Sequence, residues 1–239
     1  MNYLTLCQAF VREGAMSGLT SLTTTVGATG QAGRVTAWIN DAWADIQTMR
    51  NDWGWMRSSK LNGGGVSFAP AAAAYRATLG TGAGTVGVLA DNFGRWDITT
   101  FRNYVTTVGV SSEIRMQPVS YDAWREAYMY GAQQSVQTRP VAIAVAPDMT
   151  LSFGPPSNGL YTITGDYFIA PSTMSGDSAT PTGLPTQFHM MIVWRALWKY
   201  GYYQAASEVI DRAKREFRDL YDTLDARYAT PITMAGALA

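Results

Sequence analysis

Few residues in the sequence could carry out chemistry. His189 is the single histidine and Cys7 the single cysteine, so there is one candidate for proton transfer at neutral pH and one for nucleophilic attack. A lone Cys cannot close an internal disulfide, and one His with one Cys cannot complete a four-ligand zinc site. His189 lies between Phe188 and Met190, where a hydrogen-bonded packing histidine is the favoured interpretation. Cys7 is interpreted as a small apolar side chain.

Two further patterns are better explained by structural roles than by binding or catalysis. Residues 82–87 read Gly-Ala-Gly-Thr-Val-Gly and match the dinucleotide-binding pattern G-x-G-x-x-G, but residues 88–93 are too short for the helix that must follow. We predict a glycine-rich hairpin loop there. Spacing alone leaves a paired-carboxylate site open, although turn-capping roles are favoured for the candidates Asp91, Asp97, Asp166 and Asp177. We therefore expect no catalytic residue, no cofactor and no metal, and no enzyme.

The elements that would position these residues are helices near both ends of the chain. Apolar residues at helical spacing predict them, and glycines or polar caps mark several ends. Residues 188–200 are apolar nearly all round, which predicts a helix covered on most sides by the core or by a neighbouring subunit. Residues 14–33 are rich in Gly, Ser and Thr and predict a mobile linker or extended arm. The predicted helices are residues 4–13, 35–49, 121–130, 188–200 and 206–224.

The middle of the chain has short β-like runs separated by glycine and proline. Pro147-Asp148 predicts a hairpin turn, and the proline-rich residues 171–185 predict an extended loop. The predicted strands are residues 55–59, 66–68, 75–79, 86–89, 104–108, 113–118, 141–146, 150–153 and 160–170.

These elements predict an α+β fold. A helical bundle is formed by the N- and C-terminal helices, and a β-rich, barrel-like or sandwich-like region is inserted between them. The predicted boundaries are residues 1–54 and 186–228 for the helical domain, 55–185 for the β-rich domain with its one helix, and 229–239 for a flexible tail.

Composition limits the function classes. Only 15 % of the 239 residues are charged, and the 18 basic and 18 acidic side chains cancel. A neutral chain does not favour nucleic-acid binding as its main role, because phosphate neutralisation needs a basic excess. No apolar run approaches the ~18 residues of a membrane span, and no basic region resembling a signal peptide opens the chain. Neutral surfaces with few charged residues tend to associate with other proteins.

Aromatic residues and arginine suit such contacts. The chain has eight tryptophans and uses arginine 15 times against three lysines. Core packing and subunit contact remain equally open for the tryptophans of the penultimate helix. The candidate interface residues are Trp53, Trp55, Trp194, Arg195, Trp198 and Tyr202.

The order of these parts resembles a known family. Residues 50–55 read Arg-Asn-Asp-Trp-Gly-Trp, residues 184–189 read Leu-Pro-Thr-Gln-Phe-His, and residues 194–201 read Trp-Arg-Ala-Leu-Trp-Lys-Tyr-Gly. With the β-rich insertion and the charged last helix, this layout resembles the head-to-tail adaptor proteins of tailed bacteriophages, including tail tubular protein A. The large β region departs from smaller, mainly helical adaptors.

The resemblance implies a structural virion protein. Its members form rings, usually of twelve copies, between the portal and the tail or its nozzle. It thus implies assembly in the bacterial cytoplasm, a place in the virion neck, and DNA only as passing cargo. The tail at residues 229–239 would dock on the portal, as in some relatives. Two alternatives remain: a tail-completion or tail-tube protein, and a carbohydrate- or receptor-binding β module.

Overall fold

The computed structural model describes residues 1–16, 19, 22–50, 52–59, 65–70, 73–77 and 93–228. Within these ranges the fold is α+β, with five α-helices and two β-sheets. The chain divides into two compact units. Met1–Trp55 and Pro171–Ala239 form one, which we call the helical unit, and Met56–Ala170 form the β unit.

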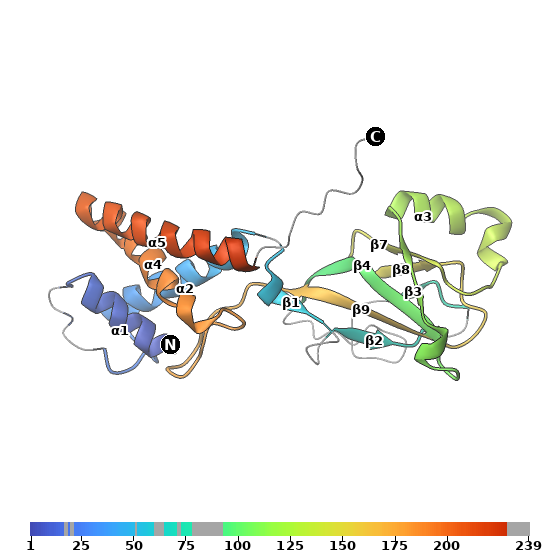
Figure 1. The fold of residues 1–239 in the computed structure, drawn as a ribbon, viewed down its shortest axis with the longest axis horizontal. Coiled ribbons are helices and arrows are strands. Elements are labelled where there is room, and N and C mark those ends of the chain that lie inside the picture. The colour runs from blue at the N-terminus through green and yellow to red at the C-terminus, as the bar shows by residue number, and fades with distance from the viewer. Residues whose placement is uncertain are drawn as a thin grey trace. The chain divides into compact units, whose positions relative to one another are not determined.

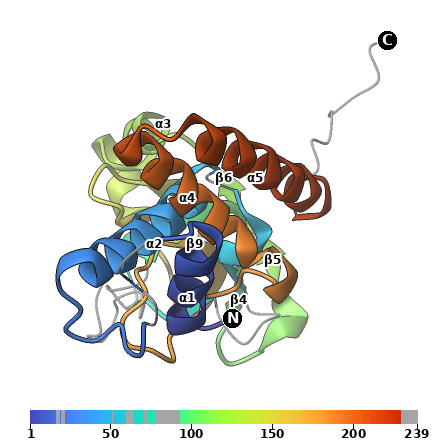
Figure 2. The ribbon, with the colours of Figure 1, turned by 90° about the vertical axis from the view of Figure 1, so that its left-hand side faces the viewer.

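The helical unit is built around one central helix, α4 (Met190–Gln204). It contacts α1 (Tyr3–Glu13), α2 (Gly30–Thr48) and α5 (Ser207–Tyr228), and Figure 2 shows it among them. Most of the apolar surface of α4 is therefore covered by helices of its own chain. None of the helices in the described ranges combines the length and apolarity needed to cross a bilayer.

Local signals set the helix ends. The Asn2 side chain accepts a hydrogen bond from the Thr5 amide at 2.9 Å and caps α1. Ala205 ends α4 in the left-handed conformation, with φ 51°. The chain then turns back into α5 beside Gly201, where a Cβ would lie 2.6 Å from Ile210 Cγ1. Glycine at this position thus permits α4 and α5 to pack closely.

Residues 171–185 form neither helix nor strand, as predicted, but they are held along α2 by two amide side chains. Asn40 accepts from the Met174 amide at 2.9 Å and donates to the Met174 carbonyl at 3.0 Å. Gln47 makes the same two bonds to Ser172, each at 2.9 Å. Both side chains replace the partners that a neighbouring strand would supply, so this segment is an ordered part of the helical unit.

The predicted linker at residues 14–33 needs correction in its second half. Helix α2 begins at Gly30, and Leu22 is buried. Asp177, from the segment beside α2, accepts hydrogen bonds from the Thr25 amide and hydroxyl, both at 2.6 Å, and from the Thr24 hydroxyl at 2.9 Å. A carboxylate distant in sequence thus anchors a stretch whose composition alone predicts mobility.

The β unit contains two sheets, both seen in Figure 1. All strand pairs are antiparallel except β6 with β7, and the described strands do not close into a barrel. The first sheet has the order β1 (Arg57–Ser58), β9 (Tyr161–Ile169), β4 (Phe93–Val105) and β5 (Ile114–Arg115), with β2 (Val66–Phe68) also paired to β9. The second has the order β3 (Arg76–Ala77), β8 (Leu151–Gly154), β7 (Ala142–Val145) and β6 (Gln117–Pro118).

The two sheets enclose the core of the β unit. Phe101 and Ile163 of the first sheet share one buried cluster with Ile143 and Phe153 of the second. Helix α3 (Tyr121–Tyr128) packs on β7 and β8 (Figure 1). It covers their other face, where a Cβ on Gly154 would collide with the ring of Tyr128. The unit therefore has three layers: the first sheet, the second sheet and α3.

Several predicted strands are confirmed: residues 66–68, 75–79, 141–146, 150–153 and 160–170 overlap β2, β3, β7, β8 and β9 in that order. The hairpin turn at Pro147-Asp148 joins β7 to β8. The strand predicted at 55–59 is wrong at its start, because a 3-10 turn occupies Gly54–Met56. The strand predicted at 86–89, the glycine-rich loop, Asp91 and the tail at 229–239 lie outside the described residues.

Two β predictions are corrected. β4 is 13 residues long and begins at Phe93, whereas the sequence predicts a strand only at 104–108. Register shifts between Phe93 and Arg95 and between Asp97 and Arg102 break the alternation that would reveal it. The strand predicted at 113–118 is two short strands, β5 and β6, in different sheets.

Candidate functional site

His189 is a packing residue. It is 4 % exposed, its Nε2 lies 3.0 Å from the Leu184 carbonyl oxygen, and its Nδ1 lies 2.7 Å from the Met1 amino group. Burial is the main cause that lowers the pKa of His189 below its ordinary value. Because the protein itself engages both ring nitrogens, the interpretation as a hydrogen-bonded packing histidine is confirmed.

Cys7 is likewise unsuited to act as a nucleophile. It is fully buried on α1, and burial, with a smaller contribution from Asp177, raises the pKa of the thiol to about 12. The thiol therefore stays protonated near neutral pH, when only the thiolate would be a good nucleophile. This agrees with its interpretation as a small apolar side chain.

The carboxylates have structural partners. Asp97 and Asp166 lie opposite each other on β4 and β9, and an Nη2 of Arg57 lies 3.0 Å from a carboxylate oxygen of each. These two carboxylates therefore form ion pairs on strands and do not cap turns. Asp177 caps residues 24 and 25, as described above. Across the ranges that the structure describes, no three His, Cys, Asp or Glu side chains are grouped to hold a metal ion.

Two of the predicted interface residues lie mainly inside the helical unit. Trp53 is fully buried, and its indole N–H donates to the Ile46 carbonyl at 3.0 Å. Trp55 is half-buried, and its ring stacks on Trp43 with 5.6 Å between centroids. Both tryptophans thus secure the end of α2 against the rest of the unit.

Two others join α4 to its neighbours. Trp194 is 8 % exposed, and the Arg212 guanidinium lies 5.0 Å from its ring centroid. Arg195 reaches Asp45 on α2 with Nε at 2.9 Å and Nη2 at 2.8 Å. The same guanidinium lies 4.6 Å from the ring centroid of Trp198. Arg195 therefore orients Trp198 while it pairs with α2.

The last two, Trp198 and Tyr202, reach the surface. Trp198 is half-buried and Tyr202 is 62 % exposed. Trp198 forms one wall of a hollow of about 420 Å³ between α4 and α5, which we call the aromatic hollow. The α5 residues that line it are Lys214, Phe217, Arg218, Tyr221 and Asp222.

The aromatic hollow combines rings with positive charge. The Lys214 ammonium lies 5.3 Å from the ring centroid of Trp198 and 5.7 Å from that of Tyr202. Within the described residues, neither Lys214 nor Arg218 forms an ion pair with an acidic side chain. Aromatic rings beside cations that have no acidic partner among the described residues are typical of protein-contact surfaces.

Sequence reasoning missed the α5 half of this hollow. In the sequence alone, the charged residues Lys214 and Arg218 are interpreted as part of a solvated helix face, because they lie off the apolar positions of residues 206–224. Their spacing to Asp222, four residues at each step, does put all three on one helix face. Only the structure shows that this face adjoins Trp198 of α4.

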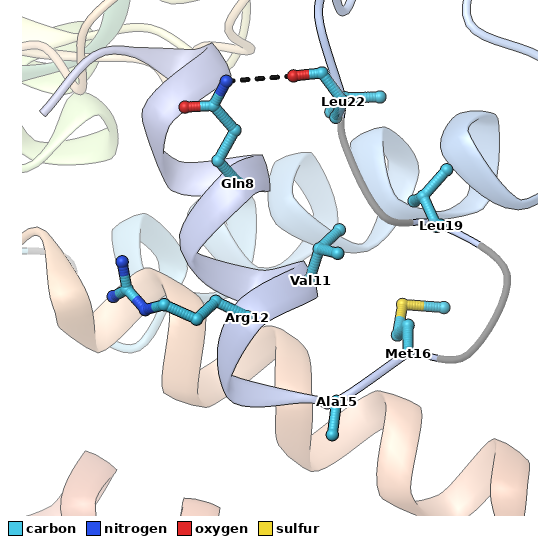
Figure 3. Close-up of a pocket in the computed structure, with 7 residues that line it drawn as sticks. All are labelled: Gln8, Val11, Arg12, Ala15, Met16, Leu19 and Leu22. Atoms are coloured by element: carbon cyan, nitrogen blue, oxygen red, sulfur yellow. Dashed lines mark hydrogen bonds between the residues drawn. The ribbon is translucent and has the colours of Figure 1, made fainter.

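A second hollow of about 300 Å³ lies beside α1, as Figure 3 shows. Val11 of α1 faces it together with Met16 and Leu19, and Gln8 donates to the Leu22 carbonyl at 2.9 Å across one end. Its lining is mainly apolar, and it brings together no group of titratable side chains suited to chemistry.

Comparison with known protein families settles the class. The sequence model of the SU10 adaptor protein family matches residues 1–235. The chain belongs to the SU10 adaptor family. A comparison with curated proteins found no match.

Family membership confirms the resemblance to phage adaptor proteins. The SU10 adaptor match makes the chain a structural adaptor protein of a bacteriophage and a component of the virion neck, where adaptors associate with portal and tail proteins. The geometry agrees with this class, because His189 and Cys7 are used for packing and exposed rings such as Tyr202 and Tyr203 lie at the end of α4.

Proposed function

We propose that this adaptor assembles into a ring, of twelve copies, that joins the portal to the tail and leaves a channel through which DNA passes. The ring assembles in the bacterial cytoplasm. Helices α4 and α5 form its wall, and the aromatic hollow receives a neighbouring subunit. The SU10 adaptor match supports the class, and the aromatic hollow is the observation that carries the contact.

Exposed aromatic rings support this contact. Tyr202 and Tyr203 at the end of α4 are 62 % and 58 % exposed, in a chain with few charges. Tyr203 accepts a hydrogen bond from Arg34 at 2.6 Å, which orders its ring at the surface. Burying such rings between subunits is favourable, because they bring large apolar area at a low cost in side-chain entropy.

The predicted interface residues then have two roles. Trp198 and Tyr202 contact the neighbouring subunit directly, and Arg195 orients Trp198 for that contact. Trp53, Trp55 and Trp194 support the surface from within the helical unit. In the same proposal, the helices of both chain ends form one bundle that carries the β unit as an insertion, and the tail at 229–239 reaches the portal.

Introducing a charged residue at the aromatic hollow tests whether this surface is needed for ring assembly. Trp198→Asp and, separately, Tyr202→Asp place a carboxylate where an apolar contact is proposed, and we expect rings to give way to folded monomers. Leu160→Asp is the matched control, since Leu160 is 56 % exposed in the β unit. Mass photometry gives the copy number, and circular dichroism verifies folding. Rings that persist in folded Tyr202→Asp and Trp198→Asp proteins would contradict the proposed contact.

The molecule that the protein binds distinguishes the alternative functions. Cross-linking of the full chain to purified portal protein is expected, whereas exclusive cross-linking to tail-tube protein would favour a tail-completion or tail-tube role. Binding on a glycan array would favour the carbohydrate- or receptor-binding module. Turnover of any substrate that is lost in His189→Ala would overturn the assignment as a purely structural protein.

A further inference from the structure

The β unit has a second candidate contact surface, on the outer face of the first sheet. Arg102 of β4 and Arg115 of β5 are direct cross-strand partners, and both are exposed. They line a hollow of about 540 Å³, which we call the arginine hollow, together with hydroxyl side chains such as Thr100 and Thr164. Like charges directly opposite each other destabilise a strand pair unless a counterion joins them.

The same sheet contains another like-charge pair, in which one counterion contacts both members. Asp97 and Asp166 are also cross-strand partners, and Arg57 bridges them as described above. For the arginine pair the compensation is incomplete. Glu113 lies 3.4 Å from Arg102, whereas Arg115 forms no ion pair within the described part of the chain. Arg115 is thus the member of the arginine pair that no described carboxylate contacts.

A complementary surface exists on the other outer layer of the β unit. Trp124 and Tyr128 turn the inner face of α3 toward the second sheet, while Asp122, Ala123, Glu126 and Ala127 are exposed. This outer face carries two carboxylates. The Asp122 side chain is 93 % exposed and reaches Arg125 only at 3.9 Å, and Glu126 forms no ion pair among the described residues.

The dimensions of the two surfaces agree. Residues four apart on a helix lie about 6 Å apart along its axis, and cross-strand partners lie about 4.5–5.5 Å apart at Cα. Two carboxylates on α3 therefore match two guanidinium groups in the arginine hollow. Because the two surfaces lie on opposite layers of one unit, each copy can use its arginine hollow toward one neighbour and its α3 toward the other. Such a heterologous contact can close into a ring.

We propose that the arginine hollow of one copy receives the Asp122–Glu126 face of α3 from the next copy. This inference rests on the proposed ring and adds a contact between β units to the one at the aromatic hollow. A polyanion such as nucleic acid fits less well, because the chain has no basic excess with which to neutralise a run of phosphates.

Charge reversal on each side tests the contact in the full chain. Arg102→Glu with Arg115→Glu places acidic groups against acidic groups, and Asp122→Arg with Glu126→Arg places basic groups against basic groups. For each double variant alone we expect the protein concentration at half-assembly, measured by mass photometry, to rise about 100-fold. The four substitutions combined should restore assembly, because the attraction returns with its sign exchanged.

Mixing the two double variants is the most discriminating experiment. Each hollow then finds an oppositely charged α3 on the other variant, so equal amounts should form rings in which the variants alternate, although neither assembles well alone. This rescue also excludes misfolding as the cause of the loss.

The outcomes separate this inference from the ring itself. Wild-type rings together with double variants that assemble equally well would overturn only the α3 contact. A wild-type chain that stays monomeric at all concentrations would overturn both proposals. If Arg102→Glu with Arg115→Glu assembles normally but loses binding to a duplex oligonucleotide in fluorescence anisotropy, the arginine hollow binds phosphate and the inference is wrong.

Discussion

At the scale of single residues, His189 illustrates how a reactive side chain becomes structural. Its neutral ring donates from Nε2 to the Leu184 carbonyl and presents Nδ1 to the Met1 amino group. A protonated ring would place two positive charges in contact in a buried setting. Burial, followed by the nearby ammonium, therefore opposes protonation in the folded protein.

This contact predicts a pH dependence of stability. Because the folded pKa of His189 lies below the unfolded value of about 6.5, the unfolded chain binds the proton first as the pH falls. The free energy of unfolding should be constant above that value and decrease as the pH falls below it toward the folded pKa. Urea unfolding between pH 7.5 and about 5.5 measures the slope. His189→Gln should flatten the slope, and an unchanged slope would contradict the explanation.

Residue spacing predicts the core of α2 only in part. The predicted apolar stripe consists of Val35, Trp38, Ile39, Ala42, Ile46 and Met49, of which Trp38 is only half-buried and Met49 is exposed. Trp43 and Gln47 are buried as well and extend the stripe to a second face, because residues distant in sequence cover that face. A single sequence gives no sign of which distant segment supplies such a cover.

At the scale of elements, the two amides on α2 act as a substitute strand. Asn40 and Gln47 are seven residues apart and therefore share one helix face, and each binds both backbone groups of one residue in the segment 171–185. Composition correctly predicts that this segment is neither helix nor strand. It cannot predict the anchoring, which depends on side chains more than 120 residues earlier in the chain.

Removal of one amide tests this anchoring. Gln47→Ala deprives the Ser172 N–H and C=O of their partners, and we expect a loss of about 2 kcal/mol in the free energy of unfolding. Amide hydrogen exchange should also accelerate in residues 171–176. Gln204→Ala, at an exposed site at the end of α4, is the control and should change stability by less than about 0.5 kcal/mol. Equal effects of both variants would contradict the anchoring role.

Strands were harder to predict than helices for a physical reason. A helix carries its whole hydrogen-bond pattern within one segment, whereas a strand depends on partners elsewhere. β4 contains charged residues and two register shifts, so its alternation is lost over residues 93–103. At Met116 the chain passes from one sheet to the other through the buried core, which in sequence resembles one continuous strand.

At the scale of the whole molecule, the two units have separate cores. Each has its own buried cluster, so we expect two thermal transitions by calorimetry. Gly165→Ala would place a Cβ 2.6 Å from the Phe101 ring and should lower the transition of the β unit by several degrees. Gln47→Ala should lower only the transition of the helical unit.

The matched control is Gly159→Ala, where an added Cβ meets no atom within 4 Å. This change should leave both transitions nearly unmoved. A single transition that shifts in both Gly165→Ala and Gln47→Ala would show that the two units unfold as one cooperative body.

The chain passes into the β unit through β1 and out of it through β9, and these strands pair side by side, with Arg57 opposite Phe168. Paired Cα atoms lie only about 5 Å apart, a span that one tight turn can close. The proposed insertion of the β-rich region therefore requires only a short gap in the helical unit. A different module, or none, could be spliced at this junction without moving the severed ends apart, so adaptors of very different length could share one helical frame.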